Sequence, residues 1–170
     1  MGTFSLLSRP ELEIKKPHKF RPIHENATHY SSGSEDFDEF LGGGLKKGLF
    51  MLLETGHTVG NDWHRPIYEM LRANFLLNGG SCLIAPSAPV TPQMILAATI
   101  PFVGKDIVSS RLRIVSYAPT IKHPSIVDVR GKNLEDVFNI QARAVQELKR
   151  RTRKETLWIL SMDTYEVSPA

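Results

Sequence analysis

The sequence predicts an α/β protein with a three-layer architecture, in which helices cover both faces of a parallel sheet. Apolar strand candidates at 49–53, 82–85 and 156–162 alternate along the chain with helix candidates. A fourth strand candidate, at 112–116, alternates apolar and polar residues. This order indicates parallel strands joined by right-handed helical crossovers. Strands that are apolar almost throughout are typical of a sheet covered on both faces.

Three helices are predicted within the first hundred residues of the chain. Ser34 to Leu41 is expected to form a short helix, because Ser34 is a good N-cap, acidic residues fill the first turn and three glycines follow. The segment at about 63–78 has apolar residues near helical spacing and ends before two glycines. Pro92 is expected to open a third helix that stops before Pro101.

The second half of the chain predicts a loop and one long helix. Residues 118–132 contain two prolines, one glycine and no clear period, so a loop is expected there. The helix from Leu134 to about Arg151 is expected to bury one apolar stripe. The stripe consists of Leu134, Val137, Phe138, Val145 and Leu148.

Length and composition are those of one ordinary globular domain. The chain has 170 residues, of which 41% are hydrophobic and 23% charged, enough for one sizeable core and too few for two. Residues 1–30 are rich in Pro, Lys and His, so we interpret them as an extension that either drapes over the domain or is partly disordered. Residues 31–170 form the expected domain. The net charge of +3 permits nucleic-acid contact without arguing for it.

The cysteine content and the hydropathy of the sequence indicate in which cellular compartment the protein works. Cys82 is the single cysteine, which excludes a disulfide framework and favours a reducing compartment. No stretch reaches the ~18 apolar residues of a membrane span, and no basic region followed by an apolar core opens the chain. We therefore expect a cytoplasmic protein without membrane contact.

Residues 54–62 occupy the position of a phosphate-binding loop but lack its lysine and its magnesium-binding hydroxyl. They follow a strand candidate and precede a helix candidate, as a P-loop does. In that motif a Lys follows the last Gly and a Ser or Thr then reaches the magnesium, but here Asn61 and Asp62 hold these places. We hypothesise that Asp62 caps the following helix and fills the anion site internally. The degenerate loop comprises Gly56, Thr58, Gly60, Asn61 and Asp62.

The segment 32–48, with Gly42-Gly43-Gly44 and Gly48, leads into this strand and loop. It closely resembles the corresponding segment of RecA-like ATPases of the RadA and KaiC type, and the resemblance spans about residues 30–165. It implies a RecA-like domain. Among relatives with a degraded loop, the chain looks most like the Elongator subunit four and six group or an archaeal KaiC-like paralogue. Those Elongator subunits form a RecA-like hexameric ring that handles transfer RNA.

The resemblance also implies where catalytic groups belong. The family's catalytic Glu follows the next strand, where this chain reads Pro86-Ser87 and has no carboxylate. The Asp that ends the later apolar strand falls near Ser161, and Asp163 takes its place only if that strand runs longer. Loss of the loop Lys and of the Glu removes the electrostatic stabilisation and water activation of phosphoryl transfer. We therefore expect no catalytic residue and no cofactor.

A basic cluster closes the long helix, and two interpretations of it stay open. Cations are favoured at a helix C-terminus and are commonly just solvated there. The cluster could instead contact a nucleic-acid backbone. The histidines have no metal-ligand spacing, so no metal site is expected. The basic residues concerned are Arg143, Lys149, Arg150, Arg151, Arg153 and Lys154.

Three functions follow. The favoured one is a non-catalytic RecA-like subunit that acts by assembly or regulation in a homo- or hetero-oligomer. The alternatives are a weak ATPase, which would bind ATP and magnesium with help from Asp163 and a neighbour's cation, and a module that binds transfer RNA or single-stranded DNA. A complete RecA-like core has further strands after 156–162, so we expect either a natural short form or a truncated core with an exposed edge.

Overall fold

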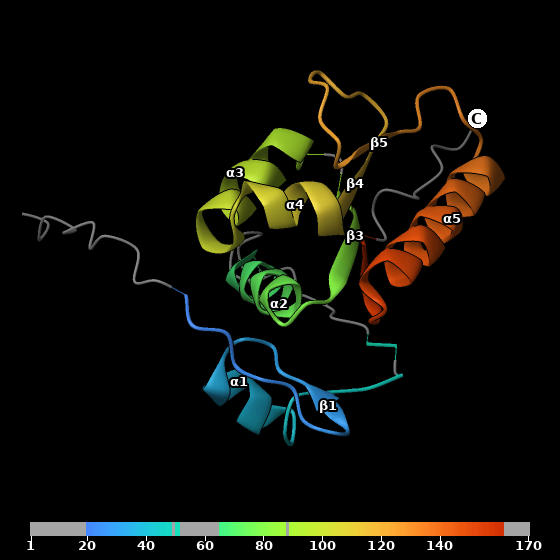
Figure 1. Cartoon of the computed structure of the whole chain (residues 1–170). Coiled ribbons are helices and arrows are strands. Elements are labelled where there is room, and N and C mark those ends of the chain that lie inside the picture. The colour runs from blue at the N-terminus through green and yellow to red at the C-terminus, as the bar shows by residue number, and fades with distance from the viewer. Residues whose placement is uncertain (1–19, 49, 52–64, 88, 162–170) are drawn as a thin grey trace, which may run out of the picture.

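Four parallel strands form the central sheet, in the order β5-β4-β3-β6. The computed structural model describes residues 20–48, 50–51, 65–87 and 89–161 (Figure 1). Most of the strand candidate at 49–53 lies outside these residues, and Phe50 and Met51, which are described, belong to no strand. The strands of the sheet are β3 (Ser81–Ala85), β4 (Leu112–Ser116), β5 (Ile126–Asp128) and β6 (Thr156–Leu160).

Helices cover both faces of this sheet (Figure 1). α2 (Arg65–Leu77), α3 (Pro92–Val103) and α4 (Lys105–Arg111) lie on one face, and α5 (Leu134–Thr152) lies on the other. The parallel sheet with helices on both faces is therefore confirmed. The sequence analysis did not predict α4.

Two apolar clusters fill the space between the sheet and the helices on its two faces, and β3 contributes to both. Cys82 and Ile84 pack with residues of α2, α3 and α4. Leu83 and Ala85 pack with residues of α5. All five residues of β3 are buried, because alternate side chains of a strand point to opposite faces and both faces are covered.

A smaller lobe precedes the sheet. It contains a two-stranded antiparallel sheet of β1 (His29–Tyr30) and β2 (Leu45–Lys46), with α1 (Glu35–Phe40) between the two strands. The Ser34 hydroxyl caps α1 by accepting from the amide of Phe37 at 3.3 Å. The prediction of this short helix is confirmed.

The end of α3 and the loop after β4 differ from the predictions. α3 runs through Pro101 to Val103. Pro101 is exposed and removes only one helical hydrogen bond, while Val103 is buried in the core. In the predicted loop, Ile126–Asp128 is a strand, β5, that pairs with β4. Ile126 and Val127 are β-branched residues that favour strands, but three residues are too few to show the alternation of a longer strand.

α5 buries a different stripe from the predicted one. Val137 and Leu148 are buried as predicted, whereas Leu134 and Phe138 are 46% and 38% exposed, so their placement in the core was wrong. Gln141 takes a core position instead, and its amide oxygen accepts from the indole N–H of Trp158 at 3.1 Å. β6 is half-buried rather than fully covered.

Residues 20–31 cross α2, and the buried side chain of Asn74 holds them there. The Asn74 amide oxygen accepts from the backbone N–H of Ile23 at 2.8 Å. Its amide nitrogen donates to the carbonyls of Ile23 at 3.0 Å and Ser31 at 2.9 Å. The described part of the N-terminal extension therefore lies against the domain.

We predict that Asn74→Ala lowers the free energy of unfolding by about 2–3 kcal/mol, because it leaves the Ile23 amide and the Ser31 carbonyl without the partner that Asn74 supplies. Urea unfolding followed by circular dichroism measures the change. Asn139→Ala, at an exposed position on α5, is the control and is expected to stay within about 0.5 kcal/mol of the wild type. Equal stability of the two variants would contradict the role given to Asn74.

Candidate functional site

The carboxyl ends of β3 and β6 lie side by side where the strand order reverses. β4 and β5 extend the sheet from one side of β3, and β6 pairs with the other side. Ala85 is paired with Leu160, and the backbone N–H of Ser161 donates to the Ala85 carbonyl at 3.0 Å. Ligands of open α/β sheets bind at the carboxyl ends of strands, at such a reversal. This edge is therefore the candidate nucleotide site.

The structure brings together the two positions at which the resemblance implies catalytic acids. Pro86 and Ser87 follow β3, and Ser161 follows β6. Tyr117 and Ala118 follow β4. None of these described residues is acidic, so they offer hydroxyl and backbone groups but no general base. The remaining predicted loop and edge residues lie outside the described part of the chain and stay predictions: Gly56, Thr58, Gly60, Asn61, Asp62 and Asp163.

An acidic residue, Asp128, ends β5, but its carboxylate is already paired with Arg130. Asp128 accepts from the guanidinium of Arg130 at 2.6–3.1 Å. Hydrogen bonds from the Arg130 side chain and backbone lower the pKa of Asp128. β4 separates β5 from β3, so this carboxylate lies away from the reversal.

The triple-glycine segment folds around Asp38. Its carboxylate accepts from the Ser31 hydroxyl at 2.5 Å and from the Ser32 N–H at 2.7 Å. Its carbonyl accepts from the amides of Gly43 and Gly44 at 2.7 and 3.0 Å. These bonds tie the end of α1 to the strand before it.

Only glycine fits position 44. Gly44 has φ of +102°, and a Cβ there would lie 2.5 Å from the carbonyl oxygen of Tyr30. Gly42 also has a positive φ, of +74°, but a Cβ there would meet nothing within 4 Å. The turn therefore demands glycine at 42 for its backbone angle, and at 44 for its angle and its close contact with β1.

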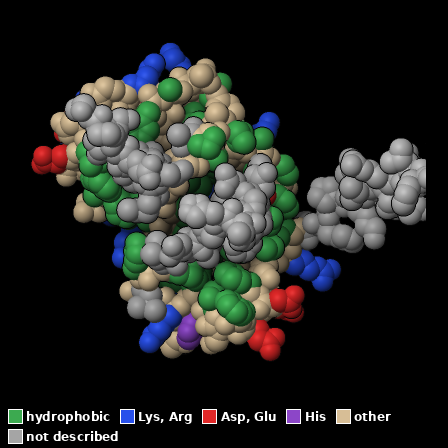
Figure 2. Space-filling view, turned by 180° about the vertical axis from the view of Figure 1, so that it is seen from behind, with side chains coloured by type: hydrophobic (Ala, Val, Ile, Leu, Met, Phe, Trp, Pro, Cys, Tyr) green, Lys and Arg blue, Asp and Glu red, His purple; other side chains and the backbone are tan. Residues whose placement is uncertain are grey.

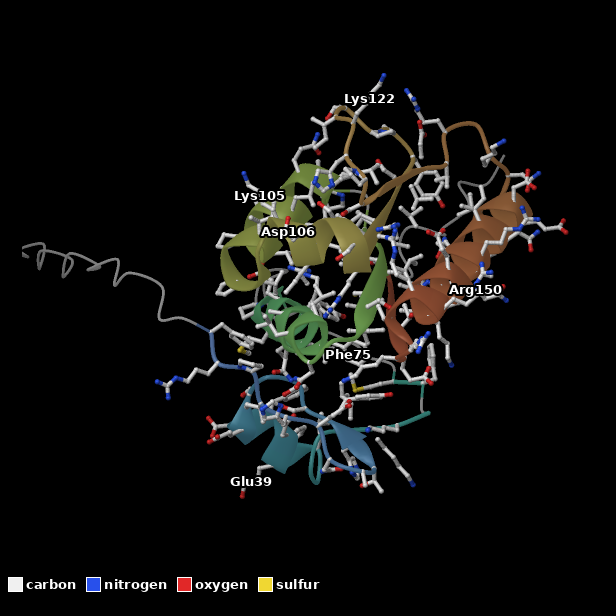
Figure 3. The ribbon with its side chains drawn as sticks, viewed as in Figure 1. Glu39, Phe75, Lys105, Asp106, Lys122 and Arg150 are labelled. Carbon is white, nitrogen blue, oxygen red and sulfur yellow. The ribbon has the colours of Figure 1, made fainter. Side chains whose placement is uncertain are left out.

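The structure divides the basic cluster of α5. Arg143 and Arg150 are exposed on this helix, where Figure 3 labels Arg150. Arg151 donates to the Ser110 carbonyl at 3.3 Å. Lys149 forms an ion pair of 2.8 Å with Glu155. The cluster is thus partly occupied by contacts within the chain.

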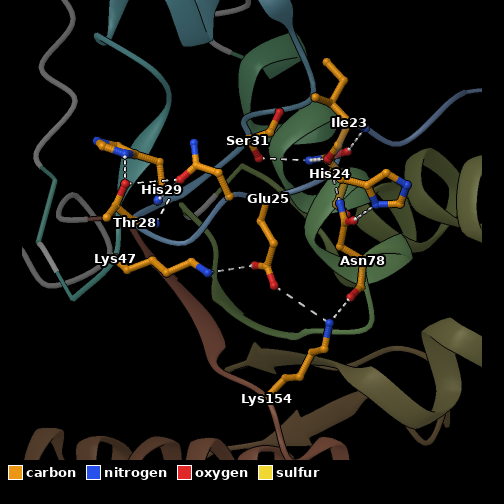
Figure 4. Close-up of polar contacts among 11 residues, drawn as sticks. Ile23, His24, Glu25, Thr28, His29, Ser31, Lys47, Asn78 and Lys154 are labelled. Carbon is orange, nitrogen blue, oxygen red and sulfur yellow. Dashed lines mark hydrogen bonds and ion pairs between the residues drawn. The ribbon is translucent and has the colours of Figure 1, made fainter.

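Arg153 and Lys154 instead line a cavity of about 260 Å³ at the opposite, amino edge of the sheet. The ammonium of Lys154 donates to the Asn78 carbonyl at 2.6 Å and lies 3.9 Å from Glu25 (Figure 4). Sequence reasoning missed this cavity. No local signal joins Glu25 to Lys154, because the two are far apart in the chain and meet only in the fold.

The cavity also contains an aromatic pair. The ring of Tyr30 meets that of Phe75 edge-on, with centroids 5.0 Å apart, and the Lys47 ammonium lies 4.8 Å from the Tyr30 centroid. Burial, followed by the charges of Glu155 and Glu25, raises the pKa of Tyr30. Its phenol is therefore protonated at neutral pH and can donate a hydrogen bond.

Other candidate chemistry is limited in the described part of the chain. Burial raises the pKa of the Cys82 thiol to about 12, which makes it a poor nucleophile. No three His, Cys, Asp or Glu side chains gather there as a metal site would require. No described helix is both long and apolar enough to cross a membrane.

We predict that Gly44→Ala destabilises the protein more than Gly42→Ala does. Both substitutions put a Cβ at positive φ, at a cost of about 1–2 kcal/mol, but only the one at 44 also forces Tyr30 away, for about 1–3 kcal/mol more. Thermal and urea unfolding of the two variants measure the difference. Equal destabilisation would show that the close approach of residues 30 and 44 is unimportant.

Comparison of this chain with protein-family models, with curated proteins and with solved structures gave no match. The functional assignment therefore depends on the geometry of the two sheet edges and on the chemistry of the residues placed there.

Proposed function

We propose that this chain is a RecA-like protein without ATPase activity that acts as an assembly or regulatory subunit. The relatives we infer are RadA- and KaiC-like ATPases, and within them the Elongator subunit four and six group or an archaeal KaiC-like paralogue. One observation carries the proposal. Where the strand order reverses, the described residues that follow the strands are Pro86, Ser87 and Ser161, and none is an acid.

The fold supports this assignment. A four-stranded parallel sheet with helices on both faces is compatible with a RecA-like layout. β3 and β6 are neighbours in the sheet, so Pro86 and Ser161, which follow them, lie at the same edge. This is the edge at which ligands of open α/β sheets bind, and the resemblance would put the two catalytic acids there. The triple-glycine segment, the most specific part of the resemblance, forms a hydrogen-bonded turn around Asp38.

The expected loss of ATPase activity follows from the size of the rate contributions that the missing groups would make. A general base contributes about 10²–10⁴-fold to a rate, and one electrostatic donor aimed at the transition state contributes about 10²–10³-fold. This chain has Asn61 at the position of the loop Lys and no carboxylate directly after β3. Losses of this size in combination put hydrolysis below detection.

Exposed hydrophobic side chains support a role in assembly. The Phe40 side chain on α1 is 83% exposed and stacks on Phe37, with ring centroids 6.3 Å apart. Figure 2 shows hydrophobic side chains at several places on the opposite face from that of Figure 1. Exposed apolar patches mark interaction surfaces. Since RecA-like domains place their nucleotide at subunit boundaries, a chain without nucleotide chemistry can still form that boundary.

We predict that the protein releases no phosphate from ATP above the buffer rate in a malachite-green assay. Asn61→Lys/Asp62→Thr, which restores the loop cation and hydroxyl, is expected to bind magnesium-ATP more tightly and still not to hydrolyse it, because no acid directly follows β3. Isothermal titration with the same nucleotide provides the binding control. Phosphate release by the natural sequence would overturn the non-catalytic assignment.

We also predict that the protein self-associates or joins a related subunit, and light scattering after size exclusion gives the mass. Phe40→Ser is expected to reduce the associated fraction without lowering the unfolding temperature, because this side chain is mostly exposed. Leu134→Ser, on a separate exposed patch, is the matched control. A strict monomer at high concentration, alone and with candidate RecA-like partners, would count against assembly.

A further inference from the structure

The cavity at the amino edge brings together cations from two distant parts of the chain. Lys47 belongs to the small lobe and Lys154 to the turn between α5 and β6. Both ammonium groups approach the single carboxylate of Glu25, at 3.7 and 3.9 Å (Figure 4). These ion pairs are long, so neither lysine is fully satisfied by Glu25.

Arg153 adds a third cation in an unusual backbone conformation. It closes α5 with φ of 54°, the only positive φ of a non-glycine residue in the described chain. Glycine is the usual residue at such a helix end, and strained positions cluster at functional sites. Arg153 is one of the residues that line the cavity, and within the described residues no hydrogen bond or ion pair engages its guanidinium.

The balance of charge around the cavity is positive. Its lining carries Lys47, Arg153 and Lys154 against Glu25 and Glu155. Glu155 is already engaged by Lys149 at 2.8 Å. An anion would therefore meet three cations. The Arg153 guanidinium has no described partner, and the ion pair of Lys47 with Glu25 is long. Lys154 donates one hydrogen bond to the Asn78 carbonyl and has two further N–H donors.

The shape of the cavity limits the ligand to a small group. Gly80 lies in its wall, where a Cβ would come within 2.4 Å of the Phe75 ring. The volume of about 260 Å³ is slightly below the usual lower bound of about 300 Å³ for small-molecule pockets. A compact oxyanion with little attached to it fits this space, whereas a folded nucleic acid does not.

We propose that this cavity binds a phosphate group, either free or as the terminal phosphate of a small ester, through Arg153, Lys47 and Lys154. A planar guanidinium matches two phosphate oxygens, and ammonium groups act as point charges beside it. The protonated Tyr30 phenol lies in the same lining. Bound phosphate would join the small lobe to the end of α5. This inference is independent of the proposed function, since it concerns the other edge of the sheet.

The test follows the unfolding temperature of the full chain with increasing inorganic phosphate, at ionic strength kept constant with sodium chloride. The unfolding temperature of the wild type is expected to rise more with phosphate than with chloride at the same ionic strength. Arg153→Gly removes the guanidinium and suits the positive φ, so its basal stability should be equal or higher while its phosphate affinity falls about tenfold or more, as for one charge-assisted hydrogen bond. Arg143→Gln, on the exposed face of α5, is the charge-matched control and should bind as wild type does.

A second variant must change the affinity in the opposite direction. Glu25→Gln removes the carboxylate that competes for Lys47 and Lys154, so phosphate should bind more tightly than to wild type. Adenosine monophosphate, titrated in parallel, distinguishes an ester from free phosphate as the preferred ligand. The proposal is overturned if wild type gains no stability from phosphate beyond chloride, or if Arg153→Gly responds to phosphate as wild type does.

Discussion

Burial of β3 on both faces is the constraint on which the rest of this structure depends. Its five residues are buried because α2, α3 and α4 cover one face and α5 covers the other. β4 and β6 hydrogen-bond to its two sides. Because β6 pairs with β3 in parallel, the carboxyl end of β3 lies next to Ser161. The amino end of β3 lies next to the start of β6, where the hydroxyls of Ser81 and Thr156 are 2.8 Å apart. Both edges of interest are therefore consequences of one buried strand.

The two edges differ in chemistry. At the carboxyl edge the described residues after β3 and β6 are Pro86, Ser87 and Ser161, which supply no charge for phosphoryl transfer. At the amino edge, Glu25 lies between Lys47 and Lys154, and Arg153 is nearby without a described partner. An ATPase needs its charged groups at the first edge. Among the described residues, Lys47, Arg153 and Lys154 gather at the second edge, where the phosphate site is proposed.

Residues 20–31 link the small lobe to the domain mainly through polar contacts. Asn74 and Asn78 both bind the backbone of Ile23, and the Asn78 side chain also meets the His24 ring at 3.1 Å. The buried Asn74 amide specifies one geometry, because any shift of residues 23–31 leaves its partners unsatisfied. The position of Glu25, and so the charge of the cavity, depends on this attachment. An apolar contact of Phe20 with Phe102, at 6.1 Å between ring centroids, adds to it.

Helices with local signals, such as the cap at Ser34 or the apolar period of α5, could be predicted from the amino-acid sequence, and so could the parallel direction of the main strands. These depend on neighbours within a few residues, so they can be predicted locally. The sequence also located the acid-free positions after β3 and β6. Only the folded chain shows that Ile126–Asp128 forms a strand, that Gln141 rather than Phe138 is buried, and that Lys47, Arg153 and Lys154 line one cavity. Each of these depends on partners distant in the chain, whose proximity no local pattern encodes.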